Sequence, residues 1–302
     1  MKYRLHLSYL LIAIFCLLLG GCSGSSSASR KEHSGPPRDS TPKVLTPSAD
    51  GVTVYQNDFA SIDASNTSQG YVMVKYNGAN EKVKLQITCP DQSCYTYLIS
   101  DRGAYDTFPL TAGNGSYTLQ VLENVAGDTY TVSLTQSINV SIEDEFLPFL
   151  YPNQYVNFHA DSQAVSKGTY SDLDVVQNIY NYVIKNISYD TEKAQNVSYG
   201  YVPDVDDTLS SKKGICFDYA ALMTSMLRSQ NIPTKLEVGY SGDAYHAWIS
   251  TYIDDKGWVD DIIQFDGDTW QIMDPTLAAT NDSAAVKKYV GDGSHYVVKY
   301  TY

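Results

Sequence analysis

The chain has 302 residues, of which 43% are hydrophobic and 18% charged, a composition typical of a globular protein with one large domain or two ordinary ones. Its formal net charge of −13 at pH 7 argues against nucleic acid as a partner, because two polyanions repel each other. Tyrosine is frequent, at 26 residues against 8 phenylalanines, and such amphipathic rings suit strand faces and polar-rimmed surfaces.

The N-terminal residues indicate export. Two basic residues precede an apolar run from Leu10 to Leu19, which is too short to span a bilayer comfortably. The letters LGGC at 19–22 resemble a bacterial lipobox, in which the signal is cut before the cysteine and the thiol receives a lipid. We expect a lipoprotein signal peptide over residues 1–21 and a lipid on Cys22, which would anchor the chain to the bacterial cell membrane, outside the cytoplasm. An uncleaved anchor and ordinary cleavage after small residues are the alternatives.

Three cysteines are left once the signal and the lipid site are set aside. Cys89 and Cys94 bracket the turn-forming letters PDQS between two strand-like runs, which predicts a short disulfide in an exported protein. A pair of reduced strand thiols is the equal alternative, because spacing alone does not fix the geometry of a disulfide. Cys216 has no obvious partner.

The segments before residue 143 predict a tether and an all-β domain. Residues 22–50 are rich in Ser, Pro, Gly and basic residues without apolar periodicity, which predicts a flexible tether. Residues 51–143 contain short alternating segments separated by turn signals such as Asn77-Gly78 and Gly127-Asp128. A small antiparallel β-sandwich is the expected fold.

From residue 144 the pattern changes to helices followed by strands. Residues 171–187 carry apolar side chains at helical spacing, with Ser171 or Asp172 as the cap. We expect a loop over 191–214, then an amphipathic helix from Cys216 to about Gln230. The remainder alternates with period two, so residues 144–302 are predicted as an α+β domain.

Cys216 is a candidate nucleophile. A helix N-terminus favours the thiolate, Gly214 permits a tight turn into the helix, and the Cys216 N–H could donate to an oxyanion. For an isolated cysteine on a helix face, packing as a small apolar residue is the competing interpretation. A nucleophilic cysteine needs a base and an acceptor that orients the base, and His246 and Asp274 lie near ends of later strands.

The order Cys, His, Asp resembles the transglutaminase-like superfamily of papain-like cysteine enzymes. The matching stretches are GICFDYAALMTSMLRSQNIPTKLEVGY, HAWISTYI and WQIMDPT, preceded by the helix-like YNYVIKNISYD. The resemblance covers roughly residues 145 to 302 and implies Cys216 as nucleophile, His246 as base and Asp274 as its orienting acceptor. The family's second oxyanion donor has no match here, and His295 is expected to be structural.

The resemblance implies a fold and a reaction class. The fold is α+β, a transglutaminase-like (papain-like) domain behind a small antiparallel β-sandwich. The activity would cleave or transfer an acyl group from an amide or peptide bond through a thioester, with hydrolysis ahead of protein cross-linking. The expected substrate is a protein, a peptide or cell-wall peptide, and no cofactor is expected. A non-catalytic binding or structural module that keeps the fold is the alternative. The acidic loops around Asp204 and 254–268 lack the ligand spacing of a calcium loop.

Overall fold

The computed structural model describes residues 35–100, 103–157, 162–198, 200–241, 244–254, 256–265, 270–272 and 296–302. Residues 37–302 form one compact unit. Within the described part of the chain, no helix is both long and apolar enough to cross a bilayer. The predicted signal peptide and Cys22 lie outside the described residues.

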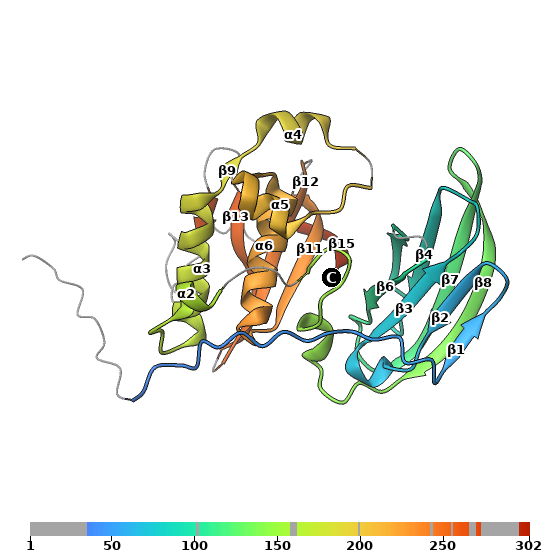
Figure 1. The fold of residues 1–302 in the computed structure, drawn as a ribbon, viewed down its shortest axis with the longest axis horizontal. Helices are drawn as coiled ribbons and strands as arrows, with labels where there is room; N and C mark the ends of the chain where they lie inside the picture. The colour runs from blue at the N-terminus through green and yellow to red at the C-terminus, as the bar shows by residue number, and fades with distance from the viewer. Residues whose placement is uncertain are drawn as a thin grey trace, which may run out of the picture. The chain divides into compact units, whose positions relative to one another are not determined.

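Two antiparallel four-stranded sheets occupy the region where alternating strands were predicted (Figure 1). The first has the order β1-β2-β3-β6, and the second has the order β5-β4-β7-β8. Their strands are β1 (Val54–Gln56), β2 (Ala60–Asp63), β3 (Tyr71–Tyr76), β4 (Val83–Thr88), β5 (Cys94–Leu98), β6 (Tyr105–Pro109), β7 (Gly115–Ala126) and β8 (Thr129–Val140).

Alternation decides which side chains of these sheets are buried. In β4, Val83, Leu85 and Ile87 are buried and the residues between them are half-buried, because successive side chains of a strand point to opposite faces. Leu85 pairs with Val121 of β7, which is also fully buried. Each such aliphatic side chain contributes roughly 1.5–3 kcal/mol by leaving water. The two sheets share this apolar core, as the predicted β-sandwich requires.

The two cysteines of β5 and the preceding turn are free thiols in the structure. Cys89 is buried in the sandwich core, whereas Cys94 is exposed. Burial raises the pKa of the Cys89 thiol to about 11, so this thiol is protonated at neutral pH. The disulfide between them stays a prediction.

Residues 37–50 differ from the flexible tether predicted over 22–50. They have no regular secondary structure, yet they hydrogen-bond along the folded unit at distances of 2.7–3.1 Å. The pairs include Arg38 with Asp172, Lys43 with Ser229 and Ser48 with Tyr71. The sequence predicted a flexible tether because most of these hydrogen bonds involve backbone groups. Backbone hydrogen bonds require no apolar pattern in the sequence, so they could not be predicted from it.

Except for η1, the described helices lie between residues 147 and 229. The described helices are η1 (Thr67–Gln69), η2 (Leu147–Phe149), α2 (Gln163–Ser166), α3 (Asp172–Asn186), α4 (Thr191–Asn196), α5 (Val205–Ser211) and α6 (Cys216–Ser229). Ser171 caps α3 as predicted, and Asp174 returns a bond to the Ser171 N–H. The loop predicted over 191–214 was wrong in part, because Asp190 and Asp204 cap the short helices α4 and α5.

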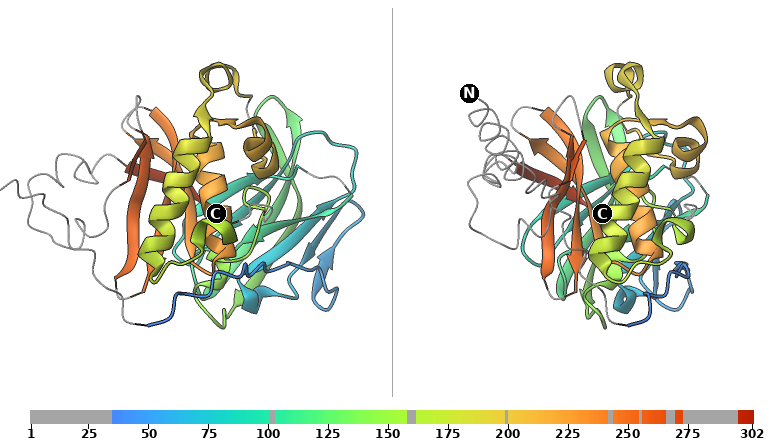
Figure 2. Two further views of the ribbon diagram at one scale, coloured as in Figure 1. Left: turned by 60° about the vertical axis from the view of Figure 1, so that its left-hand side comes forward. Right: turned by 90° about the vertical axis from the view of Figure 1, so that its left-hand side faces the viewer.

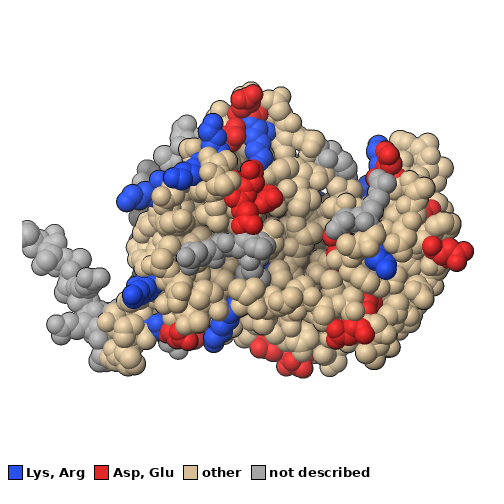
Figure 3. All heavy atoms as spheres, in the orientation of Figure 1, with Lys and Arg blue, Asp and Glu red and all other residues tan. Residues whose placement is uncertain are grey.

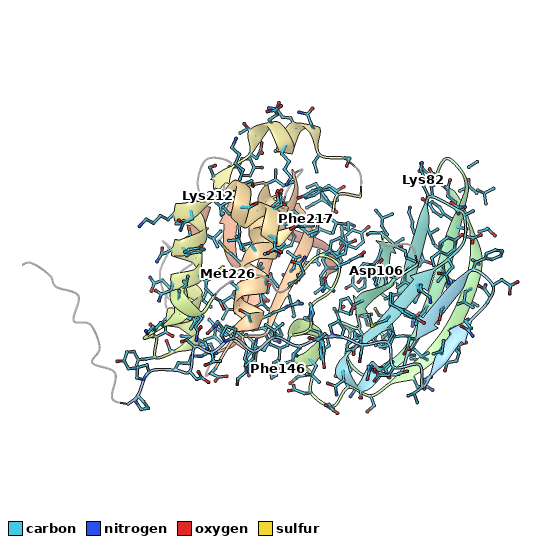
Figure 4. The ribbon with its side chains drawn as sticks, viewed as in Figure 1. Lys82, Asp106, Phe146, Lys212, Phe217 and Met226 are labelled. Carbon is cyan, nitrogen blue, oxygen red and sulfur yellow. The ribbon has the colours of Figure 1, made fainter. Side chains whose placement is uncertain are left out.

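Helix α6 is buried on every side, which corrects the predicted amphipathic helix. From Asp218 to Ser229 each residue is buried. The helix contacts α3, α5 and the strands β11 (Thr234–Ser241) and β12 (Ala244–Ile253) of a third sheet, and residues 37–50 pass its C-terminal end. Figure 2 shows α3 and α6 on one face of that sheet. In Figure 4, Phe217 lies near the upper end of α6 and Met226 lower on the same helix.

The third sheet is antiparallel and has the strand order β14-β13-β12-β11-β15. A separate two-stranded parallel pair, β9 (Ser188–Tyr189) with β10 (Lys213–Gly214), leads into α6. The strands of the large sheet are β11 (Thr234–Ser241), β12 (Ala244–Ile253), β13 (Gly257–Phe265), β14 (Trp270–Ile272) and β15 (Tyr296–Thr301). The C-terminal strand joins the sheet beside β11, as its alternation predicted.

Candidate active site

Cys216 is the first residue of α6, and the turn before the helix fixes its position. Ile215 is extended, and its N–H donates to the fully buried carboxylate of Asp218 at 2.8 Å. This bond satisfies an amide group at the helix start. A β-carbon on Gly214 would lie 2.7 Å from the Asp218 Cβ, so glycine is needed for the chain to pass this close.

A network of polar side chains, which was not predicted from the sequence, stabilises the turn before α6. Lys193 of α4 donates to Asp218 at 2.8 Å and to the Tyr201 hydroxyl at 2.6 Å. The Tyr201 hydroxyl also donates to Asp218 in a short hydrogen bond. A buried carboxylate is stable only with such partners. An acidic residue at the third position of a predicted helix was the one signal that could have pointed to Asp218.

The Cys216 thiol is held in its neutral form. Burial raises its pKa, and the backbone N–H groups of Ala247 and Phe217, which reach the sulfur, lower it by less. The expectation that the helix N-terminus would depress this pKa is therefore corrected, because desolvation outweighs the helix start. The thiol needs a base at the moment of reaction.

His246 is the candidate base. It directly precedes Ala247 in β12, and the Ala247 N–H contacts the Cys216 sulfur. His246 pairs with Gly239 of β11 and stacks on Trp248, with the ring centroids 6.3 Å apart. Burial lowers its pKa to about 4, so the imidazole is neutral at pH 7. Its Nε2 is buried and has no hydrogen-bond partner among the described residues.

Cys216 and His246 line one cavity of about 770 Å³. Most of the side chains that line it are aromatic or small. The lining residues include Tyr155, Tyr189, Ser198, Tyr201, Phe217, Tyr240, Tyr245, Lys299, Tyr300 and Tyr302. On the face drawn in Figure 3, the charged side chains form small separate groups and most of the surface is neither acidic nor basic. Within the described residues, no group of three or more His, Cys, Asp or Glu could hold a metal ion.

The third predicted member of the triad lies outside the described residues. Asp274 follows β14 in the sequence by two positions, and β14 pairs with β13. His159 and His295 also lie outside the described part. Asp274 as the orienting acceptor therefore stays a prediction.

The pH dependence of turnover tests that prediction. A carboxylate beside His246 would stabilise the imidazolium and raise its pKa above the value of about 4 that burial alone gives. Because the neutral imidazole accepts the thiol proton, activity is lost as the pH falls through this pKa. We therefore expect Asp274→Asn to move the acid limb of kcat/KM to lower pH and to reduce its maximum, measured as rate profiles against pH.

The matched control is Asp254→Asn, which changes an exposed carboxylate in the turn after β12. Its acid limb should coincide with that of the unmodified protein. An acid limb that stays in place in Asp274→Asn would show that Asp274 does not face His246.

Comparisons with known proteins identify a family for the part of the chain that contains Cys216 and His246. The profile of the transglutaminase-like superfamily matches residues 160–260, which include Cys216 and His246. Over 98 residues the chain is 32% identical to UPF0252 protein MJ1282 of Methanocaldococcus jannaschii, a match that spans 28% of this chain and 28% of that protein.

Two solved structures match large parts of the chain at low sequence identity. A proposed cysteine protease from Cytophaga hutchinsonii matches at 15% identity over 83% of this chain and 74% of its own, with a TM-score of 0.34. A proposed protease from Parabacteroides distasonis matches at 14% identity over 67% and 62%, with a TM-score of 0.28. By the profile match, residues 160–260 belong to the transglutaminase-like superfamily, within a mixed α+β fold.

Proposed function

We propose that this protein is a thiol enzyme that cleaves amide or peptide bonds through a thioester on Cys216. The observation that carries the proposal is that a neutral thiol at a helix start and a neutral imidazole line the same cavity. His246 acts as the base, and Asp274 is proposed to orient it. The Cys22 lipid would hold the enzyme at the cell membrane, where protein or cell-wall peptide is the substrate.

The reaction follows from the protonation states. As the Cys216 sulfur bonds to the substrate carbonyl carbon, the thiol proton passes to the His246 imidazole, and the carbonyl oxygen becomes an oxyanion. The Cys216 N–H is proposed to donate to that oxyanion. When the intermediate collapses, the carbon–nitrogen bond breaks, and the leaving amine takes the proton from the imidazolium. The product that stays on the enzyme is a thioester.

The second nucleophile decides between hydrolysis and transfer. Water, deprotonated by His246, would release an acid, whereas a primary amine would form a new amide. A protein lysine arrives as an ammonium ion and favours a carboxylate at its binding site. The described lining of the cavity contains no Asp or Glu side chain and contains Lys299, which repels an ammonium group. This favours water as the acceptor.

Trapping of the thioester tests the proposal. The full chain is mixed with an acetylated peptide amide library and quenched in acid, and the intact mass of the protein is measured. We expect an added acyl mass on the peptide that contains Cys216. Free acids should outnumber new amides among the products when a primary amine is supplied.

The alternative, a non-catalytic module that keeps the fold, predicts no acyl mass and no released amine with any library. New amides in excess over acids would instead assign the protein to acyl transfer. His246→Ala should lose the acyl mass, since the thiol is protonated without its base.

A further inference from the structure

The wall of the catalytic cavity comes from two separate parts of the chain. Cys94, Thr96 and Leu98 of β5 line the cavity that holds Cys216 and His246. They are alternate residues of the strand, so their side chains lie on one face of it. Strand β5 is the edge strand of its sheet. The β-sandwich is therefore part of the cavity that contains the thiol.

Close contacts hold β5 in this place. The ring of Tyr97 lies 6.3 Å from that of Tyr300 and 5.5 Å from that of Tyr302, in and just after β15. Leu98 approaches the loop before α5 so closely that a β-carbon on Gly200 would lie 2.4 Å from its Cδ1. Gly200 has a φ of +80°, which also favours glycine. Aromatic contacts of this kind stabilise the packing of β5 against β15.

The chemistry of the wall indicates what it accepts. Eight of the lining side chains are aromatic rings of Tyr and Phe, which offer flat apolar surface with a hydroxyl at the rim. Lys299 of β15 is exposed, and among the described lining residues it is the only Lys, Arg, Asp or Glu. A carboxylate in the cavity therefore meets a basic side chain and no described acidic side chain.

We propose that β5 and β15 together form the substrate-selecting wall of the site, which takes an acyl donor carrying an apolar or aromatic group beside a carboxylate and disfavours a cationic one. Thr96 and Leu98 contact the apolar part, and Lys299 pairs with the carboxylate. This inference rests on the proposed function, because it names the substrate class of the same site.

Two kinds of substitution test the wall. Thr96→Trp fills the cavity from β5, and we expect KM to rise about tenfold, while iodoacetamide, which is small, still alkylates Cys216 at the original rate. Thr131→Trp is the matched control, because Thr131 is exposed on β8 and does not line the cavity. Its kinetic constants should match those of the unmodified protein.

Substrate charge is tested with acetylated hexapeptide amides in which one scanned position carries Glu, Gln or Lys. We expect kcat/KM to favour Glu over Lys by up to about fivefold at one position, the range of an exposed ion pair. Lys299→Met should remove the preference, and Lys299→Glu should reverse it. High salt should weaken it in the unmodified protein.

Binding of the same peptides to Cys216→Ala, followed by tyrosine fluorescence, separates this inference from the proposed function. If no peptide is turned over but Thr96→Trp and Lys299→Glu change binding as described, the wall stands and the thioester chemistry is wrong. If peptides are turned over and both substitutions leave KM, charge preference and binding unchanged, the wall is wrong and the chemistry stands.

Discussion

Replacing Cys216 with alanine is expected to lower kcat/KM by about 10⁴-fold or more, because the proposed thioester forms on the Cys216 sulfur and alanine offers no nucleophile there. The fold should survive, since alanine at the first residue of α6 keeps the helix and the Asp218 bond to the Ile215 N–H. The measurements are steady-state kinetics on the library substrate and the circular dichroism of both proteins.

Cys89→Ala is the matched control, since Cys89 is a buried thiol of the β-sandwich core and does not line the cavity. It should lose some stability from the small void it leaves, while kcat/KM stays unchanged. Full activity of Cys216→Ala would remove the thiol from the mechanism and favour a binding module.

The largest expected loss of stability follows from Arg228→Met. Arg228 is fully buried near the end of α6, and its guanidinium donates at 2.6–2.9 Å to the main-chain oxygens of Thr234, Tyr151 and Tyr302. Burial lowers the pKa of Arg228 to about 9, so the group is still charged at neutral pH. Methionine fills similar volume but leaves three oxygens without this donor, at roughly 1–3 kcal/mol each.

We therefore expect the free energy of unfolding of Arg228→Met to fall by about 3–5 kcal/mol, measured by urea unfolding. The control is Lys185→Met, which changes an exposed cation at the end of α3 and should stay within about 0.5 kcal/mol. Equal midpoints for the two variants would show that the Arg228 bonds add nothing net to stability.

Local sequence signals were sufficient for much of the fold. The alternation of β4, the Ser171 cap of α3 and the C-terminal strand β15 were all predicted, because each depends on periodicity or on a capping residue within a few positions. Long-range packing was not predictable in this way. The full burial of α6 and the hydrogen bonds of residues 37–50 depend on which distant segments meet them.

The same distinction between local signals and long-range packing applies to the candidate site. Cys216 and His246 were predicted from their order and from a family resemblance, and the structure brings them to one cavity. The Lys193 and Tyr201 bonds to Asp218 were missed, because their side chains come from separate helices and loops. The direction of the Cys216 pKa was also wrong, since desolvation is a property of the surroundings.

Neighbouring residues and motif order were therefore enough to predict most strands and long helices, the superfamily resemblance of residues 160–260 and the candidate chemical groups. The protonation states of the thiol and imidazole, and the residues of β5 that line their cavity, depend on tertiary packing. The physical reason is that burial and side-chain contact are set by segments far apart in the chain, whose meeting no local pattern specifies.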